Sequence, residues 1–262
     1  DGLGRLRWVR NTDGSANVLS TFGSQANPIV RDAMRRITNV RREDGRQWNY
    51  GYNTRGELDD AYLTLEDLPE TPRLPGHTWG YTYYGLGNRL TAQVGGDRNG
   101  ANLETLNYTP NALNQYATLP ASTQHWVRGS AREDADIFVN GLWARNFGGL
   151  FSQSIDAGNQ SAPSAVNVSV EARVLGEGTG GATLVDEQSS TLIAPPASAT
   201  PTHDADGNLT EDGLWSYTWN AENRLRTAIL NQGELATVHW RKLEFAYDYM
   251  GRRFHKRVHH WV

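Results

Sequence analysis

The chain has 262 residues, of which 38% are hydrophobic, and its formal net charge is −4. This near balance argues against a general nucleic-acid-binding protein, so we expect no nucleic-acid partner. The sequence has no cysteine, which excludes disulfides, zinc–thiolate sites and thiol nucleophiles. No apolar run approaches the roughly 18 residues of a membrane span.

Aromatic residues and glycine dominate the composition, with 9 Trp, 11 Tyr and 27 Gly. Large aromatic side chains suit pleated sheets, and frequent glycine predicts frequent turns. We therefore expect an all-β protein made of short strands.

A strand–turn unit recurs along the chain. The aligned copies are 50–58, 81–90, 217–225 and 245–253, with a weaker copy at 107–116, the turn half alone at 1–6 and 203–209, and a degenerate copy at 31–37.

Each of the four aligned copies begins with an aromatic–x–aromatic pair, such as Tyr81 and Tyr83. Strand side chains alternate, so the two rings lie on one face. Asp or Asn then opens a turn, and Gly or Asn follows where a left-handed residue is needed. The unit predicts strand, tight turn, strand. Its irregular spacing favours a winding sheet of hairpins over a strict solenoid.

Several of these copies, notably Tyr81–Leu90, Asp204–Leu209 and Tyr217–Leu225, resemble the YD (Rhs-type) repeat of bacterial surface and toxin-delivery proteins. The resemblance covers about residues 1–120 and 202–262. It implies a β-sheet that spirals into a hollow shell, which in toxin systems encloses a polypeptide. The chain begins at Asp1, and we interpret it as a fragment of a longer repeat protein.

The repeat stops between residues 121 and 200, where 4 basic and 8 acidic residues give this segment a net negative charge. Residues 136–141 predict a strand ending in an Asn-Gly hairpin turn, with 142–145 as its return strand. Further strands are expected at 147–155, 166–174 and 191–193. Together they predict a small β-sandwich insert, which resembles the immunoglobulin-like modules of some Rhs-type proteins.

Two groups of residues invite a metal site. Asp204, Asp206 and Asn208 place oxygen atoms at alternate positions, as a calcium loop does, but glycine and glutamate are absent from the positions that such a loop needs. His255 and His259 would share a face only on a helix, and their segment predicts a strand. We nominate no catalytic, cofactor-binding or metal residue, and we expect no cofactor.

We therefore predict repeats in 1–120, an Ig-like sandwich in 121–200 and continued repeats in 201–262. The predicted role is a non-catalytic scaffold of a secreted or cell-surface protein. Expected partners are other copies of the chain, the rest of a longer chain or an enclosed polypeptide. The alternatives are an adhesion module that binds a surface glycan or protein through the insert and, third, a carbohydrate-active enzyme.

Overall fold

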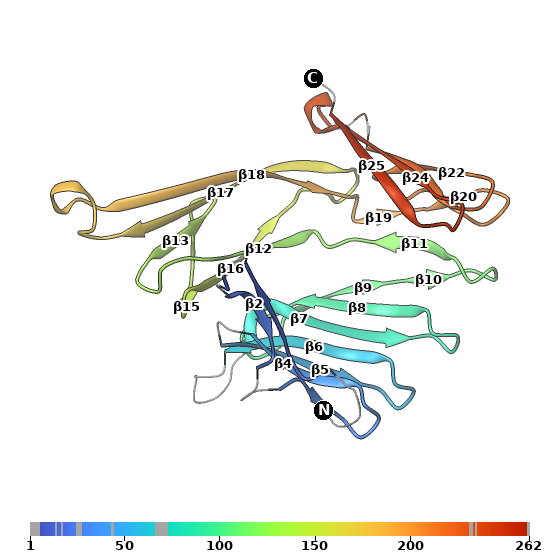
Figure 1. Ribbon diagram of the computed structural model, residues 1–262. Helices are drawn as coiled ribbons and strands as arrows, with labels where there is room; N and C mark the ends of the chain where they lie inside the picture. Colours follow the sequence, from blue (N-terminus) through green and yellow to red (C-terminus); the bar gives the residue numbers. More distant parts are fainter. Residues whose placement is uncertain are drawn as a thin grey trace. The chain divides into compact units, whose positions relative to one another are not determined.

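The structure is a computed structural model that describes residues 6–13, 15–16, 18–24, 28–42, 45–65, 73–230, 233 and 235–260. The repeat half expected at residues 1–6 lies almost wholly outside them. The chain divides into two compact units, Asp1–Leu106 and Asn107–Val262. The described residues form antiparallel strands and two short 3-10 turns (Figure 1), so the all-β prediction is confirmed. No helix among them has the length and apolar character needed to cross a membrane.

The first compact unit contains a two-stranded hairpin, β1-β2, and a seven-stranded sheet in chain order, β3 to β9. Its strands are β1 (Val9–Thr12), β2 (Val18–Phe22), β3 (Val30–Arg31), β4 (Ile37–Arg41), β5 (Arg46–Tyr52), β6 (Leu58–Leu65), β7 (Arg73–Tyr83), β8 (Arg89–Gly95) and β9 (Leu103–Asn107).

The repeats of the second compact unit form a three-stranded sheet, β10-β11-β19, and a six-stranded sheet, β20 to β25. Their bounds are β10 (Thr109–Pro110), β11 (Tyr116–Pro120), β19 (Ser198–Ala199), β20 (Thr202–His203), β21 (Leu209–Glu211), β22 (Ser216–Trp219), β23 (Leu225–Leu230), β24 (Arg241–Tyr247) and β25 (Arg253–His260).

The insert between β11 and β19 is made of two further sheets, ordered β12-β16-β15 and β14-β13-β17-β18. Its strands are β12 (Gln124–Ser130), β13 (Asp136–Val139), β14 (Leu142–Ala144), β15 (Asn146–Phe147), β16 (Leu150–Asp156), β17 (Ser164–Val174) and β18 (Leu184–Ala194).

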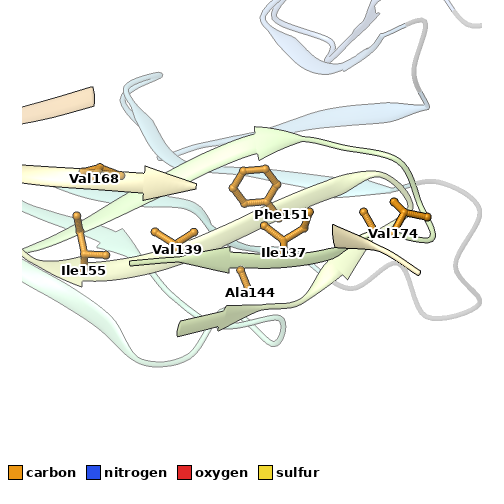
Figure 2. Close-up of a cluster of buried hydrophobic side chains, with 8 residues drawn as sticks. Ile137, Val139, Ala144, Phe151, Ile155, Val168 and Val174 are labelled. Atoms are coloured by element: carbon orange, nitrogen blue, oxygen red, sulfur yellow. The ribbon is translucent and has the colours of Figure 1, made fainter. Parts of the chain in front are cut away.

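Both sheets of the insert contribute to one apolar core (Figure 2). Ile137 and Val139 of β13 are fully buried beside Phe151 and Ile155 of β16 and Val168 of β17. Burial of such side chains contributes about 1.5–3 kcal/mol each. The insert is therefore a β-sandwich with its own core.

The local predictions for the insert hold at 136–145 and 166–174, and the strand expected at 191–193 is the end of the longer strand β18. Asn140 and Gly141 both have positive φ, 47° and 77°, which gives the Asn-Gly hairpin turn between β13 and β14. The single strand expected at 147–155 is wrong. Gly148 and Gly149, with φ of 57° and 83°, fold this segment back into the paired strands β15 and β16.

The strand order of the sandwich differs from that of a constant-type immunoglobulin domain. In that fold the first two strands share a sheet, with the second beside the fifth. Here β13, the second strand, lies between β14 and β17 in the other sheet, and the first strand, β12, pairs with β16. The resemblance therefore extends to the two-layer architecture and not to this order.

Candidate functional site

The repeat turn is a five-residue structure that is closed by the side chain of its first residue. In the turn of Asp248, Oδ1 accepts hydrogen bonds from the backbone N–H groups of Met250 and Arg252, both at 2.9 Å. The N–H of Gly251 donates to the Asp248 carbonyl, and the N–H of Asp248 donates to the carbonyl of Arg252. Gly251 has a φ of 80°, in the left-handed region. One short side chain thus satisfies two backbone donors that the turn would otherwise leave free.

The same pattern recurs in the other copies. Among the repeat copies, turns with both backbone bonds and an Oδ1 acceptor start at Asp32, Asn53, Asn111, Asp204, Asn220 and Asp248, and one more turn of this form, at Asp97, lies outside the copies. The turn at Tyr84 has the backbone bonds alone. We name each unit by the first residue of its turn. The predicted role of Asp, Asn and Gly as turn formers is confirmed in these units.

The side chain of the fifth turn residue hydrogen-bonds to the second terminal atom, Oδ2 or Nδ2, of the first turn residue. Where the first residue is Asp, its Oδ2 accepts from a donor, as in Asp32–Arg36 at 2.7 Å and Asp204–Asn208 at 3.0 Å. Where it is Asn, its Nδ2 donates to an acceptor, as in Asn53–Glu57 at 2.7 Å. The Asn220 unit departs from this rule, because Arg224 pairs with Glu222 instead.

These hydrogen bonds favour the ionised carboxylates. The pKa of Asp248 lies below its usual value, first because the Arg252 backbone N–H donates to it. The pKa of Asp204 is lowered mainly by the Asn208 side chain. The turn carboxylates are therefore held as hydrogen-bond acceptors, which is a structural use of their charge.

A second recurring contact joins the Asn53, Tyr84, Asn220 and Asp248 units to the unit before each of them. The aromatic residue just before the turn donates its polar hydrogen to a backbone carbonyl of the preceding unit. We call this contact the aromatic hydrogen bond. It joins Tyr52 to Ile37 at 2.7 Å, Tyr83 to Leu58 at 2.5 Å, Trp219 to Leu209 at 2.7 Å and Tyr247 to Leu225 at 2.9 Å.

The acceptor always occupies the same place, the first residue after the preceding turn. The second aromatic of the repeat therefore contributes a polar hydrogen as well as its ring. Of the ring pairs expected to share one face, Tyr81 and Tyr83 have ring centroids 6.5 Å apart, at a tilted angle. Trp48 and Tyr50, two positions earlier in their strand than the expected pair, are stacked with centroids 6.2 Å apart.

Successive units pair in one register, which we call the unit register. The residue seven places after the first turn residue pairs with the residue four places before the next one. The pairs are Asn39↔Asn49, Asp60↔Gly80, Glu211↔Ser216 and Thr227↔Glu244.

The turns also touch one another in a row. The fifth residue of one turn lies against the fourth residue of the next. A Cβ on the fourth residue would lie 3.4 Å from the preceding side chain at Gly56 (Arg36), 3.7 Å at Gly87 (Glu57) and 2.9 Å at Gly251 (Arg224). Asn208 reaches Asn223 by a hydrogen bond of 3.0 Å. Glycine at this position adopts the positive φ without strain, and its lack of a Cβ leaves room for the side chain of the preceding turn.

The insert leaves this arrangement intact. Leu119 pairs with Ala199 and Pro120 with Ser198, as the unit register requires for the Asn111 and Asp204 units. Gln115 lies 3.7 Å from the Cβ position of Gly207, as in the other turn contacts. The insert thus occupies the loop at the end of the hairpin opposite the repeat turns.

A buried asparagine fastens the base of the insert. Asn159 is fully buried, and its Nδ2 donates to the carbonyls of Ser122, at 3.1 Å, and Pro195, at 2.6 Å. The backbone carbonyl of Asn159 accepts a hydrogen bond from the N–H of Ala197. One side chain thereby contacts both of the segments that connect the insert to the repeat sheet.

The insert also contains a groove of about 570 Å³ between its two sheets. Apolar side chains such as Ile137, Phe151 and Val170 form its wall, and Arg128 and Asp186 are among the polar residues around it. Asp186 is its one carboxylate, so the groove does not supply the two carboxyl groups that a glycosidase requires.

The two suspected metal groups take other roles. Both oxygens of Asp204 accept hydrogen bonds from its own turn. His255 and His259 lie on strand β25 as predicted, and His259 Nε2 lies 2.9 Å from Glu244 Oε2. The described residues contain no group of three His, Cys, Asp or Glu side chains placed to hold a metal ion.

Two turns were missed in the sequence because no aromatic pair precedes them. Asp97 closes a full five-residue turn ending at Ala101, and Asp212 closes a shorter one to Trp215. The D-x-x-G pattern at Asp97 and Gly100 was the available signal. Their lack of the aromatic residue separates them from the units that carry the aromatic hydrogen bond.

Comparison with known proteins gives likenesses among solved structures only. No protein-family model and no curated protein matches the chain. A crystal structure of TcdB2-TccC3-Cdc42 aligns over 95% of this chain and 12% of its own, with a TM-score of 0.35 and 11% identity. The Photorhabdus luminescens Tc holotoxin pore carrying a TccC3 mutation aligns over the same shares, with a TM-score of 0.35 and 12% identity.

A crystal structure of TcdB2-TccC3 aligns over 92% of this chain and 14% of its own, with a TM-score of 0.22 and 12% identity. The chain thus spans a small part of the length of the chains it resembles. The repeat geometry described above, rather than these likenesses, carries the proposals that follow.

Proposed function

We propose that the chain is a non-catalytic segment of a secreted or cell-surface β-shell, whose units add side by side to build a wall around a polypeptide. The observation that carries this proposal is the unit register, which is the same at each junction where strand pairs are described, including Leu119↔Ala199 on the two sides of the insert. A constant step between units extends a sheet by equal increments.

The side chains of the repeat support a structural role. The Asp and Asn residues that could act as acids, bases or ligands have their oxygens hydrogen-bonded within the turns. The aromatic residues just before four of the turns donate to the backbone of the preceding unit, as Tyr247 does. In this proposal the residues 1–120 and 201–262 are wall, and 121–200 is a module carried on its rim.

Limited proteolysis of the full-length gene product tests the proposal. A wall that encloses a polypeptide should protect a segment outside the repeats from a protease that cleaves it readily once the protein is unfolded. Replacing Tyr52, Tyr83 and Tyr247 together by Phe should shorten that protection, because each loses an aromatic hydrogen bond between units.

The control is Tyr249→Phe, since Tyr249 is 92% exposed and lies inside a turn. Protection should be the same in this control as in the unaltered protein. Equal and rapid cleavage of every segment outside the repeats in the folded, unaltered protein would overturn the proposed enclosure.

A second candidate function is adhesion through the insert, favoured by the groove between its sheets. The ends of the insert are already paired, with the Ala121 N–H donating to the Ala197 carbonyl, so residues 122–196 are replaceable by an Asn-Gly turn. Loss of binding to a glycan array or to cells in this deletion, with repeat structure retained, supports adhesion. Retained binding removes it.

A further inference from the structure

The last strand, β25, has a hydrogen-bonded partner on one side only within the described residues, namely β24. Its side chains are exposed along nearly its whole length. The strand is also basic, with Arg253, Lys256 and Arg257 beside three histidines. An exposed edge with a single sign of charge discourages pairing with itself and selects a partner of opposite charge.

The unit register specifies what would lie beside this edge. His255 is seven places after Asp248, so it is the position that pairs with the residue four places before the next turn. By the same register, Arg257 faces the residue six places before that turn, as Arg41 faces Gln47. The carbonyl of Arg253 is the position that receives the aromatic hydrogen bond, as Leu225 and Ile37 do.

The turn of the Asp248 unit also presents a residue at a position that contacts the next turn. Arg252 is its fifth residue, the one that contacts the fourth residue of the next turn in the other units. The side chain of Arg252 is 71% exposed and is held by Asp248 at 2.8 Å. Four groups of this edge therefore lie at positions where a following unit makes its contacts. They are the backbone of His255, the carbonyl of Arg253 and the side chains of Arg252 and Arg257.

We propose that β25 binds one more strand–turn unit of defined chemistry, with Tyr or Trp just before its Asp or Asn and acidic residues four and six places before that turn. This inference rests on the proposed wall function and names the neighbour that the wall takes at this edge. The acidic residues face His255 and Arg257, and the aromatic residue donates to the Arg253 carbonyl.

The leading strand of a second copy fits this edge poorly. Its β3 would bring Arg31 to the position of the aromatic donor, which adds a charge of the same sign. It would bring Pro28 to the position opposite His255, and proline lacks the N–H that a sheet ladder uses. The chemistry therefore selects an acidic unit over another copy of this chain.

A cyclised hairpin that copies residues 46–65 is a suitable probe, because Arg46 and Leu65 are already paired and Tyr52 occupies the aromatic position. The acidic probe carries Gln47→Glu and Asn49→Glu, which places carboxylates opposite Arg257 and His255. A matched probe carries Gln47→Lys and Asn49→Lys. Fluorescence anisotropy measures binding of each probe to the whole chain, and amide hydrogen exchange locates it.

We expect the acidic probe to bind about tenfold or more tightly than the lysine probe at low salt, with new protection confined to 253–260. This follows from the cross-strand charge pair between Arg257 and the carboxylate at position 47 of the acidic probe, which the lysine probe replaces by a repulsion. Tyr52→Phe in the acidic probe should weaken binding about three- to tenfold through the lost hydrogen bond. Arg257→Glu in the chain should narrow or reverse the preference between the probes, and Arg257→Gln, which removes charge alone, should give an intermediate result.

Equal binding of the acidic and lysine probes, or protection at another edge, would overturn the inference. If the probes fail while the full-length protein still protects an enclosed segment, the wall proposal stands and this neighbour is wrong. If the probes bind as expected while no segment is protected, the edge chemistry stands and the enclosure is wrong.

Discussion

Leu119 pairs with Ala199 in the register that joins consecutive repeat units elsewhere in the chain, although the whole insert lies between them in sequence. The neighbouring pair, Pro120 and Ser198, keeps the same register. A one-residue slip would move every side chain of the following strand to the other face of the sheet. The insert therefore enlarges a loop between two strands, and the register of the repeat sheet is unchanged.

The aromatic hydrogen bond should be worth about 1 kcal/mol of unfolding free energy at Tyr247. Tyr247→Phe removes the hydroxyl that donates to the Leu225 carbonyl at 2.9 Å and leaves that acceptor without this donor. Denaturant unfolding measures the loss. Tyr249→Phe is the control, because its 92% exposed side chain should change stability by less than about 0.5 kcal/mol. Equal effects of the two substitutions would contradict the role of the bond.

The fourth turn position should accept Asn far better than Ala. Gly207 has a φ of 85°, and a Cβ there would have no neighbour closer than 3.7 Å, so backbone strain decides the outcome. Gly207→Ala should cost about 1–2 kcal/mol. Gly207→Asn should cost clearly less, since Asn114 and Asn223 already occupy this position at φ of 63° and 57°. Thermal unfolding compares the two, and an equal cost would argue against the left-handed requirement.

The base of the insert should lose stability when the donating side-chain amide of Asn159 is removed. Asn159→Ala leaves the Ser122 and Pro195 carbonyls without its N–H groups and should destabilise the insert by about 1–3 kcal/mol. Asn159→Asp should be worse, because a carboxylate would face two carbonyl oxygens in a fully buried place. Proteolysis near residues 122 and 195 provides the readout. Gln160→Ala, at an exposed site, should leave the cleavage rate unchanged.

Acid should loosen the contact between β24 and β25. The pKa of Glu244 is lowered from 4.5 to about 2, first by the hydrogen bond from Lys242 and then by His259. Because the folded-state pKa lies below the ordinary one, this contribution is complete above about pH 4.5 and is lost as the pH falls toward 2. Amide exchange of 253–260 should rise over this interval. Glu244→Gln should reduce the rise, and an unaltered pH profile in that variant would contradict the assignment.

Self-association of the chain should increase with salt. The edge of β25 is basic, so two copies that meet at this edge repel each other, and added salt screens the repulsion. Light scattering from low to about 1 M salt should show a rising mean mass. Lys256→Glu together with Arg257→Glu should weaken this salt dependence. A strictly monomeric chain at high concentration and high salt would argue against edge pairing.

Much of the fold was readable in the sequence where a feature is local. The turns of Asn53, Asp204, Asn220 and Asp248 were predicted because their hydrogen bonds close within five residues. The Asn140-Gly141 hairpin was predicted for the same reason, since both residues tolerate positive φ. The Gly148-Gly149 turn was overlooked because the apolar residues on either side of it read as one continuous strand.

The sequence by itself thus determined the repeat unit, its aromatic face and its turn chemistry, because short-range sterics and hydrogen bonds dictate them. Only the tertiary structure decided which carbonyl receives Tyr52 or Tyr247, that Asn159 fastens the insert, and how β12 to β18 are ordered. These depend on closing long loops. The free energy of loop closure changes slowly with length, so the choice among distant partners falls to packing and register, which no local pattern encodes.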